Sequence, residues 1–314
     1  MYNLAMSTHS LLHLIGNTPL VELSHLSPKR GISIFAKLEG QNPSGSIKDR
    51  IVLNIVEEAE RLGHLKPGDT IVEASSGNTG IALAFVGKQK GYQVRVVIPQ
   101  EVAPGISDIL NLYEAQVEWC DPEVGMKGAI NIARELGKNQ NHYFLGQFDA
   151  AANLQAHYQT TGPEIVQALP QIDVCVAGIG TGGTIMGVGR RIRETNPQAR
   201  IIGVEPQPGE RLQGLRSLSE GYLPPLLDLG QLNGRYLVNA ATAIDTAHLV
   251  AQTEGILVGI SSGATLSTAL RVAKDMDRGN IVVIFSDGGW KYLPARPWDA
   301  AREGSEALNE THWW

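Results

Sequence analysis

The chain has 314 residues, of which 43% are hydrophobic and 18% are charged, so it is long enough to bury two hydrophobic cores. Its 26 Lys and Arg residues against 32 Asp and Glu residues give a net charge of −6 without a basic stripe, which argues against a nucleic-acid-binding protein. Two cysteines are too few for a disulfide framework, and no apolar run reaches the roughly 18 residues that a membrane span requires.

The first predicted helix begins at Lys48, after the turn-forming run Asn42-Pro43-Ser44-Gly45-Ser46-Ile47. Apolar residues recur on one face at Ile51, Ile55 and Ala59, so this helix packs on a core. A lysine at such a helix start has a buried stem and an amine near positive backbone dipoles, and both effects favour the neutral amine that attacks an aldehyde. Lys48 is therefore the candidate catalytic residue; a solvated surface lysine is the alternative.

The next strand, near 70–74, ends in the polar turn Ser75-Ser76-Gly77-Asn78-Thr79-Gly80, which opens a helix near 78–90. Such a turn directs backbone N–H groups and side-chain donors at one place, which suits a carboxylate or another small anion. Ordinary helix capping is the alternative, but four polar side chains in six residues exceed what capping needs.

Strands and helices continue to alternate through the rest of the chain. We predict strands near 94–98, 117–119, 173–177, 200–204 and 280–285, and helices near 105–115, 125–136, 183–194, 245–254 and 263–276. This alternation predicts an α/β protein with mostly parallel sheets covered by helices. We expect two domains, residues 1–148 and 149–314, with part of 1–42 packing on the second domain and a ligand in the cleft between them.

The run Gly178-Ile179-Gly180-Thr181-Gly182-Gly183-Thr184 lies between the strand near 173–177 and the following helix. Glycines allow close backbone approach, and the helix start supplies partial positive charge, so the run is typical of a phosphate cradle. No lysine follows as in a P-loop. A dinucleotide-binding site remains an alternative, because the glycine spacing fits and Glu205 lies about twenty residues further on.

A lysine for a carbonyl, a cradle for a phosphate and a turn for a carboxylate together describe pyridoxal phosphate with a bound amino acid. The chain resembles the cysteine synthase family of fold-type II pyridoxal-phosphate enzymes, and most of all its cysteine synthase B branch. The segments that carry the resemblance are His13–Leu20, the Lys48 run, Ser75–Gly80, Gln147-Phe148, Thr160–Ile165, Gly178–Thr184, Gly259–Gly263 and Ser286–Gly289.

The resemblance implies a role for each matching residue. Lys48 would form the Schiff base and move the α-proton, Asn78 would bind the phenolic oxygen of the cofactor, and Ser261 would meet the pyridine nitrogen, where capping of the next helix is the alternative. The residues that would bind the cofactor phosphate are Gly180, Thr181, Gly182, Gly183 and Thr184. The residues that would bind the substrate carboxylate are Ser75, Ser76, Thr79 and Gln147.

The activity that the resemblance implies is β-replacement, in which L-cysteine forms from O-phosphoserine or O-acetylserine and a sulfur donor. Arg216 resembles an arginine that synthase B members place over the active site, where it would receive a phosphate or an anionic donor such as thiosulfate; Arg211 is the weaker alternative. The donor would be sulfide, thiosulfate or a thiocarboxylated carrier protein.

Two segments depart from the usual family pattern, and a third feature is unassigned. Residues 102–108 replace a Glu-Arg-Arg sequence with one containing Pro104-Gly105, and Trp290-Lys291-Tyr292 resembles the actinobacterial type of synthase B, which favours O-phosphoserine. The tail ends in Trp313-Trp314, which would dock on a partner chain or near the active-site mouth unless it is disordered.

The sequence also predicts the cellular location and the oligomeric state of the protein. Residues 1–16 lack a basic n-region and a cleavage site, so we expect no secretion signal and a cytoplasmic location, and family resemblance predicts a homodimer. Four functions compete with cysteine synthesis: a serine/threonine dehydratase, a cystathionine β-synthase-like enzyme, a Rossmann oxidoreductase and a non-catalytic binding module.

Overall fold

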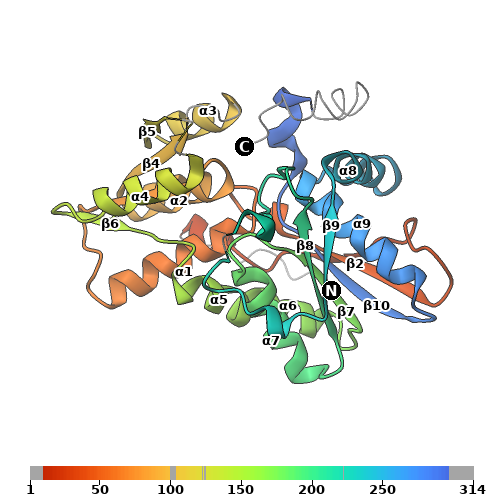
Figure 1. Ribbon diagram of the computed structural model, residues 1–314. Helices are drawn as coiled ribbons and strands as arrows, with labels where there is room; N and C mark the ends of the chain where they lie inside the picture. The colour runs from red at the N-terminus through yellow and green to blue at the C-terminus, as the bar shows by residue number, and fades with distance from the viewer. Residues whose placement is uncertain (1–9, 100–103, 122, 124, 222, 297–314) are drawn as a thin grey trace.

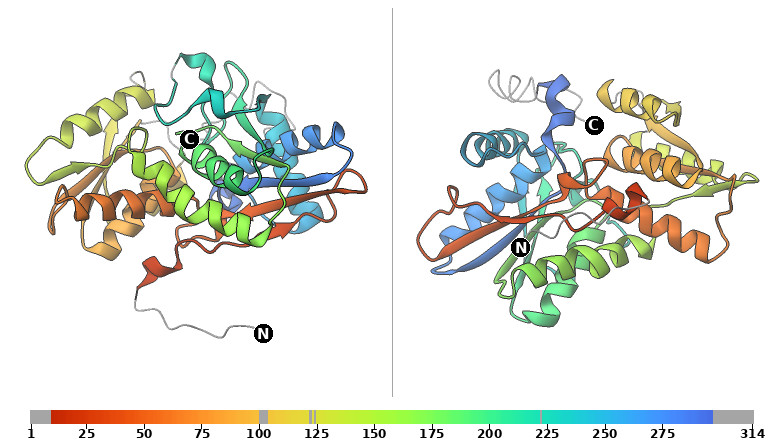
Figure 2. Two further views of the ribbon diagram at one scale, coloured as in Figure 1. Left: turned by 90° about the horizontal axis from the view of Figure 1, so that it is seen from below. Right: turned by 180° about the vertical axis from the view of Figure 1, so that it is seen from behind.

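The computed structural model describes residues 10–99, 104–121, 123, 125–221 and 223–296. In this part the chain forms two sheets that lie side by side, the smaller on the left of Figure 1 and the larger on the right. The two views in Figure 2 show the same separation. The predicted α/β class with mostly parallel sheets is confirmed.

The smaller sheet has the spatial order β5-β4-β3-β6, and all its neighbouring strands are parallel. Successive side chains of a strand point to opposite faces. In β3, Ile71 therefore belongs to a hydrophobic cluster with residues of α1, α2 and α3, whereas Val72 belongs to a cluster with residues of α4 on the other face. The bounds of these elements are β3 (Thr70–Ala74), β4 (Gln93–Pro99), β5 (Gln116–Cys120), β6 (His142–Phe144), α1 (Lys48–Arg61), α2 (Asn78–Lys90), α3 (Pro104–Leu112) and α4 (Gly125–Leu136).

The larger sheet has the order β1-β2-β10-β7-β8-β9, and only the β1–β2 pair is antiparallel. In β7, Val176 packs toward α8 and α9, and Cys175 packs toward α6 and α7. None of the described helices combines the length and the apolar character needed to cross a bilayer. The bounds are β1 (Leu20–Glu22), β2 (Ile32–Leu38), β7 (Val174–Gly178), β8 (Arg200–Pro206), β9 (Gly234–Val238), β10 (Gly279–Phe285), α6 (Gly162–Ala168), α7 (Gly183–Thr195), α8 (Ala240–Glu254) and α9 (Ile260–Lys274).

Every predicted strand and helix is present, with ends that differ by a few residues. The strands β1, β2, β6 and β9 and the helical stretch from 151 to 168 were not predicted. This stretch consists of α5 (Ala151–Ala156), a π-helical turn η4 (His157–Thr161) and α6. Within residues 20–38, the strands β1 and β2 belong to the larger sheet. The domain boundary near 148 stays a prediction. The short 3₁₀ helices are η1 (Leu11–Leu14), η2 (Glu39–Gln41), η5 (Leu218–Glu220), η6 (Leu229–Gln231) and η7 (Gly289–Ala295).

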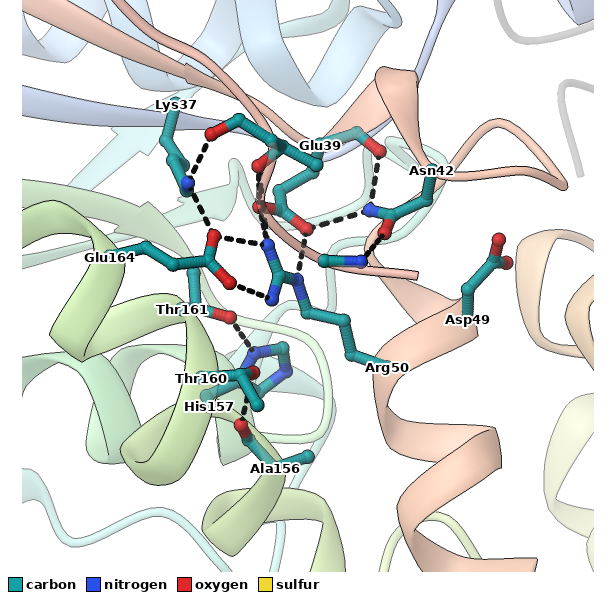
Figure 3. A network of polar contacts seen from close by, with 12 residues as sticks. Lys37, Glu39, Asn42, Asp49, Arg50, Ala156, His157, Thr160, Thr161 and Glu164 are labelled. Carbon is teal, nitrogen blue, oxygen red and sulfur yellow. Dashed lines mark hydrogen bonds and ion pairs between the residues drawn. The ribbon is translucent and has the colours of Figure 1, made fainter. Parts of the chain in front are cut away.

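A buried ion network joins α1 to β2 and α6 (Figure 3). The guanidinium of Arg50, two residues after Lys48, contacts the carboxylate of Glu39 at 2.7 and 2.9 Å and that of Glu164 at 2.7 Å through two nitrogens. Lys37 adds a second cation, 2.6 Å from Glu164. Two cations therefore face two carboxylates, which satisfies the requirement that buried charges be paired. The network fixes the start of α1, where Lys48 lies.

Candidate active site

Lys48 is the first residue of α1, and β10 and the turn after it hold the preceding turn in place. The Ile47 N–H donates to the Ser286 carbonyl at 2.8 Å, and the Gly288 N–H donates to the Gly45 carbonyl at 3.2 Å. Gly45 has φ +87°, and a Cβ there would lie 2.8 Å from the Trp290 ring, so only glycine fits. The sequence of this turn thus determines where the lysine points.

The environment of Lys48 favours its neutral form. Burial lowers the pKa of the Lys48 amine to about 8, while the charges of Asp287 and Glu73 oppose this shift and the charge of Arg216 adds to it. An amine with this pKa is partly unprotonated near neutral pH and can act as a nucleophile or a base. The alternative of a solvated surface lysine is therefore wrong for Lys48.

Lys48 lines a cavity together with residues from five other parts of the chain. The other lining residues are Ile47, Asn78, Gly178, Gly180, Thr181, Gly182, Thr184, Gly214, Leu215, Ser261 and Ser286. A wider hollow of about 510 Å³ along α7 is lined mainly by apolar and arginine side chains and contains none of the predicted site residues. The predicted cofactor-binding residues other than Gly183 thus line the smaller cavity. Its lining does not include the predicted substrate-binding residues Ser75, Ser76, Thr79, Gln147 and Arg216.

The loop before α7 has a shape that only glycines allow. Gly182 has φ +87°, a Cβ on Gly180 would lie 2.6 Å from the Gly214 carbonyl oxygen, and a Cβ on Gly183 would lie 2.0 Å from Asn153 Oδ1. The N-cap of the helix that follows is Gly182, which has no side chain, and the Gly183 N–H donates to the Thr181 hydroxyl only at the long distance of 3.4 Å. The first N–H groups and the dipole of this helix can therefore bind an anion, such as a phosphate, that enters the cavity.

The polar turn after β3 serves two purposes. The Ser75 hydroxyl accepts the N–H groups of Gly77 at 3.2 Å and Gly80 at 2.9 Å, so Ser75 does meet the capping requirement of α2. Thr79 instead donates its hydroxyl hydrogen to Gln147 Oε1 at 2.7 Å. This contact brings together two residues that the sequence separates by 68 positions.

Comparison with known proteins identifies the family to which this chain belongs. Residues 11–287 match the family described as pyridoxal-phosphate dependent enzymes. The chain belongs to this family. It is 39% identical over 294 residues to a cysteine synthase of Staphylococcus aureus, covering 90% of this chain and 95% of that protein. It is 40% identical over 280 residues to cysteine synthase B of Escherichia coli, covering 89% of this chain and 92% of that one. The crystal structure of O-ureido-L-serine synthase superposes with a TM-score of 0.90 at 35% identity, over 96% of this chain and 98% of that chain.

Membership of the pyridoxal-phosphate-dependent family and the contacts of Glu205 argue against the dinucleotide interpretation of the glycine loop. The dinucleotide alternative needed Glu205 as a ribose ligand, but this buried carboxylate accepts the Leu218 N–H and pairs with Arg235, both at 2.7 Å. The pyridoxal phosphate of the family fits the cavity instead, because the cavity joins an amine of lowered pKa to a glycine cradle that a Cβ would fill.

Ser261 lies in the first turn of α9, and its side chain is buried at the cavity wall. The capping alternative is wrong for this residue, because the N-cap of α9 is Gly259 and makes no side-chain cap bond. Arg216 is half-buried beside the cavity, with its guanidinium carbon 4.6 Å from the centre of the Phe148 ring. The positions of the predicted residues fit a pyridoxal-phosphate enzyme, and their individual roles stay predictions.

The structure adds residues to this site that sequence reasoning missed. Asn153 donates to the Thr181 hydroxyl at 3.0 Å and to the Gln147 carbonyl at 2.8 Å, and His157 Nε2 lies 3.1 Å from the Thr184 hydroxyl. Burial holds the pKa of His157 well below its usual value, so this ring is neutral. Both residues come from the helical stretch 151–168, which no sequence pattern predicted.

Glu73 is a further buried group beneath the polar turn. Its carboxylate accepts the N–H groups of Ala74 at 2.7 Å and Gln147 at 3.0 Å. Burial raises the pKa of Glu73 to about 7, against the opposing effect of these hydrogen bonds. Glu73 lies in the predicted strand near 70–74, and nothing in its spacing distinguished it from the other residues of that strand.

Two of the unusual segments extend outside the described residues. Val102, Ala103 and the tail with Trp313-Trp314 fall there. Pro104 and Gly105 begin α3, and among the described residues a Cβ on Gly105 would meet only Pro294 of η7, at 3.9 Å. The altered segment therefore starts a helix that faces the turn after β10.

We predict that Gly183→Ala weakens cofactor binding by at least about tenfold, because the new methyl group overlaps Asn153 Oδ1 and pushes the cradle apart. A titration of the apo-enzyme with pyridoxal phosphate, followed by visible absorption, measures the effect. Gly234→Ala is the matched control, because a Cβ at this strand residue meets only ordinary contacts at 3.5 Å or more. Equal affinities for the two variants would contradict the cradle.

Proposed function

We propose that this protein makes L-cysteine by pyridoxal-phosphate-dependent β-replacement on an O-activated L-serine. The observation that carries the proposal is the convergence, on one cavity, of an amine with a pKa of about 8 and a glycine-rich helix start. When bound, the cofactor delocalises the electrons released at the α-carbon and so makes loss of the β-substituent possible. The similarity to cysteine synthases supports this reaction over the other chemistries of the family.

Each group of the cofactor has a proposed partner in the cavity. Lys48 would bind the aldehyde, Asn78 the phenolic oxygen and Ser261 the ring nitrogen. A neutral serine hydroxyl does not hold a full proton on that nitrogen as a carboxylate would, which moderates the electron demand and suits elimination at the β-carbon. The phosphate would lie on Gly180, Thr181, Gly182, Gly183 and Thr184.

The substrate would be held by residues at the smaller sheet. Ser75, Ser76, Thr79 and Gln147 would bind the α-carboxylate, and Lys48 would take the α-proton. The acetate or phosphate then leaves from the β-carbon, and the sulfur nucleophile adds there. Because the polar turn and the lysine come from the starts of two helices, α2 and α1, their spacing is fixed by packing.

A product assay tests the function. The holoenzyme given O-acetylserine or O-phosphoserine with sulfide is expected to form cysteine with release of one acetate or phosphate per turnover. Pyruvate as the main product would support the dehydratase, and cystathionine from serine and homocysteine would support the cystathionine β-synthase-like alternative.

We propose O-phosphoserine as the preferred substrate, because Arg216 places a guanidinium close enough to affect Lys48 electrostatically. Arg216→Leu is expected to lower kcat/KM for O-phosphoserine by about 10- to 100-fold, the usual value of hydrogen bonds to a charged group, and to change that for O-acetylserine little. Steady-state kinetics with both substrates measures the difference.

Arg211→Leu is the parallel variant, since Arg211 is the other arginine of the segment. A larger loss from Arg211→Leu would move the role to that residue, and no loss of selectivity from either change would refute anion recognition by this segment. We further propose that the protein is a homodimer in the cytoplasm. Its sulfur donor would be sulfide, thiosulfate or a thiocarboxylated carrier protein.

A further inference from the structure

Lys291 is a buried lysine that the proposed mechanism does not use. It lies in η7, just after β10, and its side chain is only 2% exposed. Burial lowers the pKa of its ammonium, and the carboxylates of Asp287 and Asp49 oppose that shift. An ammonium in such a place requires partners that compensate its lost hydration.

Those partners include residues of two turns that contribute to the wall of the cavity. The ammonium of Lys291 donates to the side-chain oxygen of Asn78, in the turn after β3, and at 3.4 Å to the carbonyl of Gly45, in the turn before Lys48. It also lies 3.7 Å from Asp287 Oδ2. The Lys291 side chain thus connects the turn before Lys48 with the turn that carries Asn78.

The amide of Asn78 is held at both ends. Its Nδ2 donates to Asp287 Oδ2 at 2.8 Å, and the hydroxyl of Tyr292 donates to the same carboxylate oxygen at 2.5 Å. Lysine is only a donor and an ionised aspartate only an acceptor, so the two neighbours permit one orientation of the amide and exclude its 180° flip. Because Asn78 lines the cavity, this orientation decides what it presents to a ligand.

We propose that Lys291 is a positioning residue for the cofactor site, which acts by fixing the amide of Asn78 against the Lys48 turn. The proposal rests on the placement of the cofactor in this cavity. Trp290 supports the same contact from outside, because its ring packs on Gly45 and lies 5.4 Å from the Lys291 ammonium. A lysine at this place therefore ties cofactor orientation to the integrity of both turns.

A double-mutant cycle on cofactor affinity tests this inference. Lys291→Met removes the donors but keeps an unbranched side chain, and it is expected to weaken pyridoxal phosphate binding at least about tenfold and to shift the visible absorption band. If Lys291 acts through Asn78, adding Lys291→Met to Asn78→Ala causes little further loss. Fully additive losses, or an unchanged affinity and band in Lys291→Met, would overturn the proposal.

Two further variants keep the test decisive. Lys291→Gln retains an N–H donor without the charge and is expected to recover part of the affinity; it also replaces Lys291→Met in the cycle if that variant does not fold. Lys90→Met is the matched control, because Lys90 is a partly buried lysine on α2 that pairs with Glu60 at 2.8 Å, and its affinity should be that of the unaltered protein. Uptake of pyridoxal phosphate is measured without any serine derivative, so a failure of cysteine synthesis would leave this test intact.

Discussion

Replacing Lys48 by alanine is expected to abolish cysteine formation, with a loss of at least about a thousandfold in turnover, while the fold stays intact. The amine is proposed both to bind the cofactor aldehyde and to move the α-proton, and no other lysine of the described residues lines the cavity. Cysteine assays on the holoenzyme and circular dichroism of the variant measure the two parts of the expectation.

The pH dependence of Lys48 gives a second measurement of the same prediction. With a pKa of about 8, the amine becomes neutral as the pH rises through 8, so uptake of pyridoxal phosphate by the apo-enzyme should accelerate up to that pH and then level off. The pKa is lowered from the model-peptide value of 10.5, so the unfolded chain binds more protons between about 8 and 10.5, and stability rises with pH there. Below pH 8 the burial of the Lys48 ammonium lowers the free energy of unfolding by its full amount. The Lys48→Ala variant lacks this ammonium and therefore does not have that loss of stability.

Borohydride reduction followed by peptide mapping identifies the lysine that binds the cofactor. The reduced adduct is expected on Lys48; an adduct on Lys291, a buried lysine near this cavity, would contradict the assignment. Lys88→Ala is the control, because Lys88 is exposed on α2 and pairs only with Glu114 at the surface. Near-native cysteine formation by Lys48→Ala would refute the role of this residue.

Several strands of the two sheets were predictable, because buried parallel strands appear in the sequence as continuous apolar runs. β3, β4, β7 and β10 are of this kind. β2 is an exception, since it pairs in parallel with β10 and was not predicted. β1 and β6 were missed because three residues are too few for a pattern, and β9 because exposed and buried residues mix along it. The stretch 151–168 carries Asn153, Gln155, His157 and Gln159 and a π-helical turn, so its residues do not repeat with a regular helical period.

The candidate site was predictable where the backbone itself sets the requirement. Gly180, Gly182 and Gly183 are needed because any Cβ would collide, and this need appears in the sequence as a glycine run before a helix. The groups behind the cavity could not be predicted in the same way. Asp287 and Lys291 reach Asn78 across more than two hundred residues, and such a contact depends on strand order, which no local pattern encodes.

Arg50→Met is expected to lower the free energy of unfolding by about 3–5 kcal/mol, because it leaves buried carboxylates without their main cation. Arg50 is 3% exposed and Glu39 is fully buried, and the two make two hydrogen bonds at 2.7 and 2.9 Å. Urea denaturation of the apo-protein measures the loss as a lower midpoint. Arg61→Met, at the exposed end of the same helix, should change the free energy of unfolding by no more than about 0.5 kcal/mol.

The double variant Arg50→Met/Glu39→Gln separates charge from packing. It removes one cation and one carboxylate and leaves Lys37 paired with Glu164, so it is expected to be more stable than Arg50→Met alone. A double variant that is less stable than the single one would show that the hydrogen bonds of Glu39 to Thr18 and Asn42, rather than charge balance, hold this part of the fold.

The same network predicts how stability depends on acid. Burial acts to raise the pKa of Glu164, but the hydrogen bonds and charges of Arg50 and Lys37 outweigh burial and lower it to about 2. A carboxyl with a lowered native pKa contributes stability above its unfolded value of about 4.5, and that contribution is lost as the pH falls from there toward 2. Arg50→Met should therefore flatten the decline in stability across this pH range. If the stability of the variant declined with acid as steeply as that of the unaltered protein, Lys37 alone would keep the pKa of Glu164 low. Arg50 would then anchor α1 without affecting the protonation of Glu164.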